Sequence, residues 1–250
     1  MKLKRTKTII NNYSDPGFAR TTNEDFAWSG TNDVLHNMLI VSDGVGSYPG
    51  SQVASRMICK TFIKSFLNKD YLKWEINDWF LRVINKSKME MFGYIQKNRE
   101  HKDMSATLVL ALVFKGHIHI FWIGDSRAYF LNHNEVKLLT EDHNLYNYLI
   151  SINSTDEQIK KYENSLSSIT NSIDANCVKH KKYDYICKPL KKDSLLFLAS
   201  DGFYNFYQME DLFNVIRNND SNNLSKELVD QAISNGSHDN ISFSYLGVFN

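Results

Sequence analysis

Two apolar segments that lie far apart in the chain end in the same Ser-Asp-Gly turn. The first is residues 39–44 (LIVSDG) and the second is residues 195–202 (LLFLASDG). An uncharged run followed by a carboxylate and a glycine is typical of a core strand that ends in a turn. Either copy alone is compatible with an ordinary surface turn, because Asp-Gly is a common turn pair. Together they predict two core strands that each place an aspartate, Asp43 or Asp201, at their end.

The composition is typical of one catalytic domain in a reducing compartment. A chain of 250 residues with 42% hydrophobic residues can bury a sizeable core, which excludes disordered and fibrous classes. A net charge of +1 gives no sign of nucleic-acid binding, and the basic clusters at residues 2–5 and 179–182 are expected to be solvated faces. No apolar run is long enough for a signal sequence or a membrane span, so we expect a cytoplasmic protein.

The three cysteines do not indicate a functional site. Cys59, Cys177 and Cys187 are too few and too irregularly spaced for a disulfide framework or a zinc site. None has the setting of glycines and a following arginine that would mark a reactive cysteine nucleophile. His117 and His119 alternate along one strand, but without a third ligand nearby we expect ordinary strand residues.

Hydrophobic periodicity predicts a mixture of strands and helices. Apolar residues at three- and four-residue steps predict helices over residues 51–67 and about 76–95. Lys115-Gly116 joins two β-rich runs and predicts a hairpin, so the middle of the chain is expected to form antiparallel sheet from consecutive neighbours. Strands are expected at residues 6–10, 26–28, 107–114, 117–123, 128–131, 135–138 and 241–248.

The region from about residue 145 to 182 is polar and weakly periodic, which is typical of a mobile surface subdomain. Residues 154–157 (STDE) match a capping box and predict a helix that continues to about residue 164. Two further helices are expected at residues 209–217 and 224–234, the second ended by Asn235-Gly236.

Acidic residues stand beside several predicted strand ends. Carboxylates that converge cannot all stay ionised without counter-charge, and divalent cations supply it. Ligands that offer only oxygen favour Mg²⁺ or Mn²⁺ over Zn²⁺, and two such ions about 3.5 to 4 Å apart can hold a bridging hydroxide in line with a phosphorus atom. Arg20 is the candidate for binding the phosphate. The acidic residues are Glu24, Asp25, Asp43, Asp125, Asp201 and Asp239.

At these positions the sequence resembles the metal-dependent protein phosphatases of the protein phosphatase 2C type, as a bacterial-like member. The resemblance implies an α+β fold of two stacked antiparallel sheets flanked by helices on both faces, a four-layer α-β-β-α sandwich. It also implies a single domain, residues 1–250, with a flap subdomain at about residues 145–182. The blocks that carry it are residues 20–25 (RTTNED), 43–46 (DGVG), 104–108 (MSATL), 124–129 (GDSRAY), 140–143 (TEDH), 200–202 (SDG) and 239–240 (DN).

The resemblance assigns a metal-binding role to six residues. Asp43 would bridge two metals and the Gly44 carbonyl would bind one of them. Asp201 and Asp239 would hold the first metal, while Glu24 would face the second through water. Asp125 would join Asp239 at a third, weaker site.

The resemblance also assigns roles around the reacting phosphate. Arg20 would bind the substrate phosphate, Asp43 would hold the metals that activate the water, and Asp25 would orient metal-bound water. Animal members carry a histidine directly after the Asp-Gly pair, where this chain has Val45. The proton for the leaving group would then come from metal-bound water.

These features predict a serine/threonine protein phosphatase that uses Mn²⁺ or Mg²⁺ and hydrolyses phosphoserine and phosphothreonine with a metal-bridging hydroxide, without a phospho-enzyme. Expected partners are phosphoproteins and a cognate Ser/Thr kinase, with no nucleic acid, no membrane and a monomeric state. Two alternatives stay open: a catalytically silent regulator with this fold, and a phosphatase of small molecules. A full set of metal carboxylates argues against the silent regulator, because a binding module has no need for so costly a charge cluster.

Overall fold

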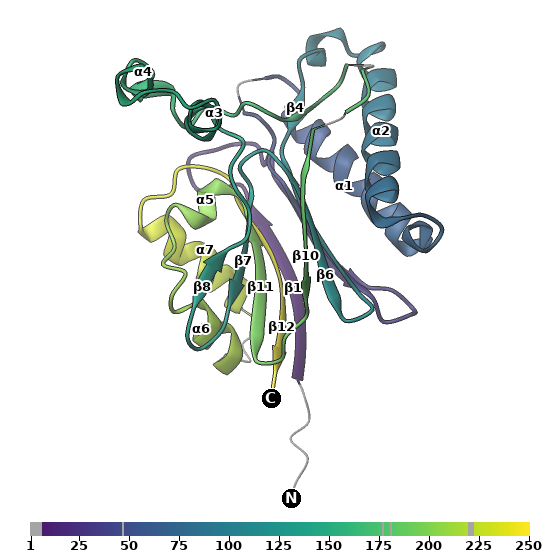
Figure 1. Ribbon diagram of the computed structural model, residues 1–250, viewed down its shortest axis with the longest axis vertical. Coiled ribbons are helices and arrows are strands. Elements are labelled where there is room, and N and C mark those ends of the chain that lie inside the picture. Colours follow the sequence, from purple (N-terminus) through teal and green to yellow (C-terminus); the bar gives the residue numbers. More distant parts are fainter. Residues whose placement is uncertain (1–6, 47, 177, 181, 220–222) are drawn as a thin grey trace, which may run out of the picture.

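Two five-stranded antiparallel sheets pack face to face at the centre of the molecule (Figure 1). The structure is a computed structural model that describes residues 7–46, 48–176, 178–180, 182–219 and 223–250. In spatial order, the first sheet contains β1 (Lys7–Asp15), β12 (Ile241–Phe249), β11 (Ser194–Ala199), β7 (Arg127–Leu131) and β8 (Val136–Leu138). The second contains β10 (Asp184–Pro189), β6 (His117–Ile123), β5 (Leu108–Phe114), β3 (Asn37–Ser42) and β2 (Phe26–Thr31). A small third sheet pairs β4 (Ser105–Ala106) with β9 (Ile173–Asp174).

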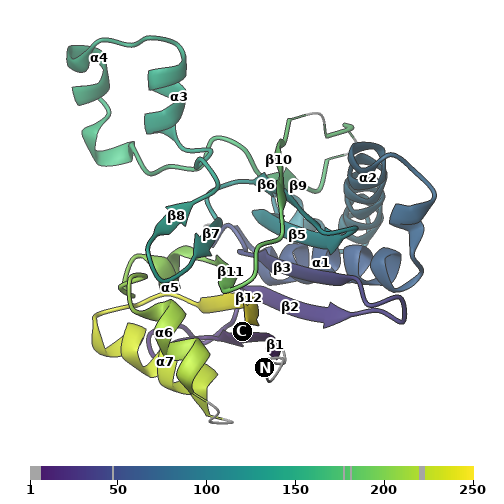
Figure 2. The ribbon, with the colours of Figure 1, turned by 60° about the horizontal axis from the view of Figure 1, so that its bottom comes forward.

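Helices cover the outer face of each large sheet, so the expected four-layer sandwich is confirmed. The helices α1 (Ser51–Leu67) and α2 (Ile76–Ile95) lie against the second sheet. The helices on the first sheet are α5 (Asp201–Tyr204), α6 (Leu212–Asn218) and α7 (Leu224–Ser234). Figure 2 shows the two helical layers on opposite sides of the paired sheets.

The central strands are apolar on both faces because they separate two cores. In β3, Leu39 and Val41 face the core between the sheets, whereas Met38 and Ile40 pack toward α1 and α2. The strands β5 and β11 alternate in the same way between the inter-sheet core and a helix-facing core. A strand buried on both faces reads as a continuous hydrophobic run, and this explains why β3 and β11 are conspicuous in the sequence.

The helices α3 (Leu145–Ser151) and α4 (Asp156–Lys160) project away from the sandwich in both ribbon views (Figures 1 and 2). A β-bridge between Asn144 and Ile169 closes the base of this projection. The capping box at the start of α4 is formed by Thr155 and Gln158, one residue later than expected, and α4 ends at Lys160 rather than near residue 164. The helix α3 was not predicted, because only Leu149 in it is buried and no apolar stripe marks it.

Most other elements match the sequence-based predictions, with two corrections. The bounds of α1 and α2 are confirmed, and β1 extends to Asp15, while the expected first residue of that strand lies outside the described residues. The two central hairpins do not form one sheet of consecutive neighbours: β5 and β6 belong to the second sheet, and β7 and β8 to the first.

Strand β10 was not predicted because it is a half-exposed edge strand with polar residues and a proline. No helix in the described part of the chain has the length and apolar character needed to cross a bilayer.

Candidate active site

A cavity of about 800 Å³ lies at the end of the sandwich from which α3 and α4 project, opposite the N-terminal end (Figure 1). The loops that follow β3 and β6 supply acidic residues to it, as do the first residue of α5, directly after β11, and the loop before β12. The structure thus brings together seven of the eight site residues predicted from the sequence. They are Arg20, Glu24, Asp43, Gly44, Asp125, Asp201 and Asp239.

The backbone of Asp43 is fixed by two hydrogen bonds to Thr107, one to its hydroxyl and one from its amide. The Asp43 amide donates to Thr107 Oγ1 at 3.0 Å, and the Thr107 amide donates to the Asp43 carbonyl at 2.8 Å. Thr107 Oγ1 also hydrogen-bonds Ser126 Oγ at 2.6 Å. The ends of β3 and β6 are therefore connected through one buried hydroxyl, which sets the position of Asp43 relative to the adjoining Asp125.

Two glycines in the cleft are required by close backbone approaches. A Cβ on Gly44 would lie 2.8 Å from the Glu24 carbonyl oxygen, and one on Gly202 would lie 2.1 Å from the Asn240 carbonyl oxygen. These separations are shorter than any side chain tolerates. The glycines after Asp43 and Asp201 thus let the neighbouring acidic loops pack against the strand ends.

Asn240 holds the segment that carries Arg20 and Glu24. Its buried side chain accepts a hydrogen bond from the Glu24 amide at 2.8 Å. Its Nδ2 donates to the carbonyls of Pro16 and Thr22 at 2.9 and 3.0 Å. Because both donors and the acceptor of the amide are used, this residue fixes an irregular segment that has no strand ladder of its own.

Asp25 lies beneath the cavity and is only 2% exposed. Ser200 Oγ donates to its Oδ2 at 2.7 Å, whereas its Oδ1 is buried with no hydrogen-bond partner. Burial raises the pKa of Asp25 to about 6, although its contacts with Ser200 and Asp43 act in the opposite direction. An unsatisfied buried carboxylate oxygen is costly, so this atom needs a donor that the described side chains do not supply.

Four further carboxylates, those of Glu24, Asp43, Asp125 and Asp201, are also held in an environment that disfavours their charged forms. Burial, followed by the charges of Asp25, Asp201 and Asp125, raises the pKa of Asp43 well above its usual value. Burial and nearby carboxylates raise the pKa of Asp125 to about 7 and raise the pKa of Asp201. Burial raises the pKa of Glu24, and Arg20 opposes this effect. Added positive charge relieves such mutual repulsion and lets the carboxylates stay ionised.

This donor set fits divalent cations that prefer oxygen. The cavity offers carboxylates and the Gly44 carbonyl, with no Cys or His in its lining, which is the chemistry of Mg²⁺ and Mn²⁺ sites. Among the described residues, no three His, Cys, Asp or Glu side chains already form a complete ligand group for a metal. The Asp25 carboxyl contacts Asp43, and its Oδ1 has no hydrogen-bond partner among the described residues, which leaves an acceptor beside the candidate metal ligands.

Arg20 is paired with one of these carboxylates. Its Nη2 donates to Asp239 Oδ2 at 3.0 Å, and both side chains are nearly half exposed, at 45% and 43%. The guanidinium therefore lies at the mouth of the cavity, within reach of a group bound between the acidic residues.

Sequence reasoning did not assign roles to a second cationic group in the cleft. Arg127 forms a bidentate ion pair with Asp142, with Nε to Oδ1 at 2.9 Å and Nη2 to Oδ2 at 2.7 Å. Its guanidinium carbon lies 4.0 Å from the ring centre of Tyr204, and the Tyr204 hydroxyl donates to the Asp125 carbonyl at 3.1 Å. The blocks at residues 124–129 and 140–143 contain this pair, but only the fold reveals that they meet.

The described cysteines lie away from this chemistry. Cys59 is buried in the helix-facing core, and burial raises the pKa of its thiol. Cys187 is exposed on the edge strand β10, and Cys177 lies outside the described residues. Neither described cysteine lines the cavity.

Comparison with known proteins agrees with this geometry. The family model for protein phosphatase 2C matches residues 20–235. A putative protein phosphatase of Mycoplasma genitalium is 35% identical over 240 residues, which cover 92% of this chain and 91% of that protein. The S. agalactiae serine/threonine phosphatase is 26% identical with a TM-score of 0.78, covering 97% of this chain and 100% of that structure.

A further structure shares the fold at lower identity. The catalytic domain of the serine/threonine protein phosphatase PstP, solved with two manganese ions, has a TM-score of 0.77 at 17% identity and covers 98% of this chain and 100% of its own.

Fold, cleft and sequence together define a metal-dependent phosphoric monoester hydrolase. The chain belongs to the protein phosphatase 2C family. It is a metal-dependent protein serine/threonine phosphatase whose cofactor is Mn²⁺ or Mg²⁺.

Proposed function

We propose that the chain dephosphorylates phosphoserine and phosphothreonine at the cleft around Asp43, by direct attack of water and without a phospho-enzyme. The observation that carries this proposal is the concentration of carboxylates around Asp43 whose pKa values burial and mutual repulsion raise. Such a cluster is unfavourable as a purely structural feature and becomes favourable when cations occupy it.

The cleft residues would divide the metal-binding task by position. Asp43 would lie between the two cations, with the Gly44 carbonyl on one of them. Asp201 and Asp239 would hold the first cation, and Glu24 would face the second through water. Asp125, together with Asp239, would form a weaker third site. Bound cations supply the charge that lowers the pKa of water and stabilises the phosphoryl transition state.

The remaining residues would act on the substrate and on the water. The exposed guanidinium of Arg20 would bind the phosphate oxygens, for which its planar fork is suited. The unpartnered Oδ1 of Asp25 would accept a hydrogen bond from the attacking water and orient it. Val45 lines the cavity where a proton-donating side chain would otherwise stand, so the leaving group would take its proton from water.

Arg127 would act as a positioning residue for the Asp125 loop. Arg127 pairs with Asp142 and stacks on Tyr204. The Tyr204 hydroxyl in turn donates a hydrogen bond to the Asp125 carbonyl, so Arg127 would orient this loop through Tyr204. A lysine at this position could not form both hydrogen bonds to Asp142 or stack on the ring.

Phosphoproteins are the substrates of this activity, and a Ser/Thr kinase that phosphorylates them would be its counterpart. We further propose that the protein acts in the cytoplasm as a monomer, as one domain spanning residues 1–250, without membrane or nucleic acid. The projection at about residues 145–182 would serve as its flap, since Ser167 and Ser168 line the catalytic cavity beside the base of that projection.

Phosphatase assays distinguish this proposal from its alternatives. The purified protein should hydrolyse a phosphothreonine peptide with Mn²⁺ and lose this activity with EDTA or with Asp43→Asn. A protein that binds the phosphopeptide but hydrolyses nothing over a range of Mn²⁺ and Mg²⁺ concentrations would be a silent regulator. Faster hydrolysis of sugar phosphates than of phosphopeptides would instead identify a small-molecule phosphatase.

A further inference from the structure

A second cavity, of about 220 Å³, adjoins the catalytic one and has the opposite charge. It lies where the chain returns from the flap, between β9 and β10. Lys88, Lys179 and Lys182 line it together with His180, and its one acidic lining residue is Asp174. The basic cluster at residues 179–182 therefore contributes to a concave site in the described part of the chain, rather than only to a convex solvated face. Lys181, within the cluster, lies outside the described residues.

The inner wall of this basic pocket is fixed by one buried ion pair. Lys88 on α2 is 4% exposed and pairs with Asp174, whose other oxygen accepts a hydrogen bond from Asn176 Nδ2 at 2.6 Å. This pairing uses the only carboxylate of the lining. Lys179 and Lys182 remain at the exposed side of the pocket, so its net charge is positive.

His180 is held between these lysines by hydrogen bonds to the backbone. Its amide donates to Asn85 Oδ1 at 2.9 Å, and its Nε2 lies 2.5 Å from the Lys182 carbonyl. Burial, and secondarily the charge of Lys88, lower the pKa of this imidazole. This favours the neutral ring, whose single N–H, on Nε2, donates to the Lys182 carbonyl without adding repulsion between the lysines.

The two cavities meet at Ser172, which lines both. The catalytic cavity holds six carboxylates against two arginines, whereas the basic pocket holds three lysines against one aspartate. A phosphorylated segment bound in the catalytic cavity would place its neighbouring residues at this border. An acidic neighbour would be attracted by the basic pocket, whose lysines outnumber its one aspartate.

We propose that the basic pocket binds an acidic side chain of the substrate, so that the enzyme favours phosphorylated residues that have Asp or Glu nearby in the sequence. Lys179 and Lys182 would make the ion pairs, and the Lys88–Asp174 pair would keep the pocket open. This inference rests on the proposed function, because it describes the substrate of that same cleft.

The test compares phosphothreonine peptides whose flanking residues are acidic or neutral, assayed with the Mn²⁺-loaded full chain. The parent should show a kcat/KM about 5-fold higher for the acidic peptides, a preference that decreases with added salt, as two partly exposed ion pairs would give. The variant Lys179→Gln/Lys182→Gln should reduce this ratio to about 1. The charge-reversal variant Lys179→Glu/Lys182→Glu should instead have a higher kcat/KM for peptides flanked by lysine.

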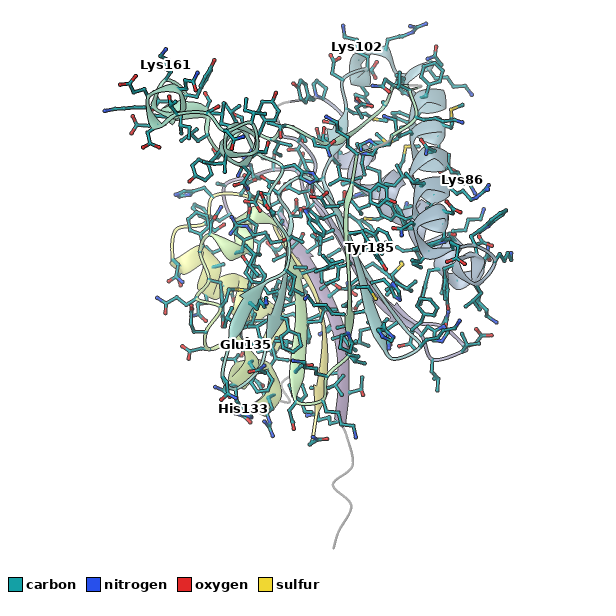
Figure 3. All side chains as sticks on the ribbon, in the orientation of Figure 1. Lys86, Lys102, His133, Glu135, Lys161 and Tyr185 are labelled. Carbon is teal, nitrogen blue, oxygen red and sulfur yellow. The ribbon has the colours of Figure 1, made fainter. Side chains whose placement is uncertain are left out.

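A matched control separates this effect from a change in net charge. Lys86→Gln/Lys102→Gln removes the same charge from exposed positions outside the flap, which Figure 3 labels, and should retain the acidic preference. Hydrolysis of p-nitrophenyl phosphate should be equal in all variants, because this substrate is too small to reach the basic pocket. A parent without acidic preference, or a Lys179→Gln/Lys182→Gln variant that keeps it, would overturn the inference. A parent that cannot hydrolyse p-nitrophenyl phosphate would instead contradict the phosphatase function.

Discussion

The guanidinium of Arg20 donates a hydrogen bond to Asp239 across 3.0 Å, which joins the candidate phosphate-binding group to a candidate metal ligand. The two residues are separated by 218 intervening positions and meet because the loop between β1 and β2 packs beside the start of β12. A cation bound by Asp239 competes for the same carboxylate and leaves the guanidinium available for a phosphate. Metal binding and phosphate binding are therefore expected to favour one another.

Replacing Arg20 should affect substrate binding more than metal binding. Arg20→Ala removes charge-assisted hydrogen bonds to the phosphate, so the KM for a phosphothreonine peptide should rise about 10-fold or more, with a smaller change in kcat. Steady-state kinetics at saturating Mn²⁺ measures this. The control is Arg56→Ala on the exposed side of α1. An unchanged KM in Arg20→Ala would remove this residue from the phosphate site.

Neutralising the central carboxylates should have opposite effects on activity and on the stability of the metal-free protein. Asp43→Asn and Asp201→Asn should each lower kcat at least about 100-fold, because the cations lose a ligand. The same substitutions relieve repulsion among buried carboxylates, so the metal-free Tm should stay constant or increase. Activity assays and thermal unfolding in EDTA test both signs. A marked decrease in the metal-free Tm would show that these carboxylates stabilise the fold without cations.

The buried hydroxyl of Thr107 should matter for catalysis although it lies behind the metal ligands. Thr107→Val keeps the shape but leaves the Asp43 amide and Ser126 Oγ without this partner, which should cost about 1 to 3 kcal/mol of stability and reduce kcat. Thr61→Val is a matched control in α1. The Thr61 hydroxyl hydrogen-bonds the Met57 carbonyl and the Glu90 carboxylate of α2, and it does not line the catalytic cavity. Equal losses of activity in both variants would contradict a specific effect on Asp43.

The acidity of the cleft predicts how stability depends on pH without metal. The pKa of Asp125 is raised to about 7 in the folded protein, whereas an aspartate in the unfolded chain titrates near about 4. Between these values the folded state retains a proton that the unfolded state has released, so stability should fall as pH rises from about 4 to about 7. Asp125→Asn should weaken this decline, which Tm measured in EDTA at successive pH values would reveal. An unchanged slope in the variant would assign the decline to other groups.

The sequence was sufficient to predict those features that depend on short, strongly patterned segments. The two-sided strands β3 and β11 read as unbroken apolar runs, and α1 and α2 carry regular apolar stripes, so their positions follow from local periodicity. Strand β10 and helix α3 were not predicted, because an exposed edge strand and a projecting helix bury too little surface to require a hydrophobic pattern in the sequence.

Within the site, the residue types could be predicted but their supporting contacts could not. Six acidic residues and Arg20 stand out beside turns, and one cavity contains all of them except the buried Asp25. The links from Thr107 to Asp43 and from Arg127 to Asp142 depend on how the two sheets stack. Local sequence patterns do not indicate how the two sheets stack, so these contacts could be identified only from the three-dimensional structure.

The most direct test of the proposed site counts the Mn²⁺ ions that the full-length protein binds at equilibrium, by calorimetric titration and by paramagnetic resonance of the bound ions. The carboxylates around Asp43 predict two ions that are magnetically coupled through their shared ligand, and loss of this coupling in Asp43→Asn. Binding of a single uncoupled ion, or an unchanged pair in Asp43→Asn, would contradict a two-metal site centred on this residue.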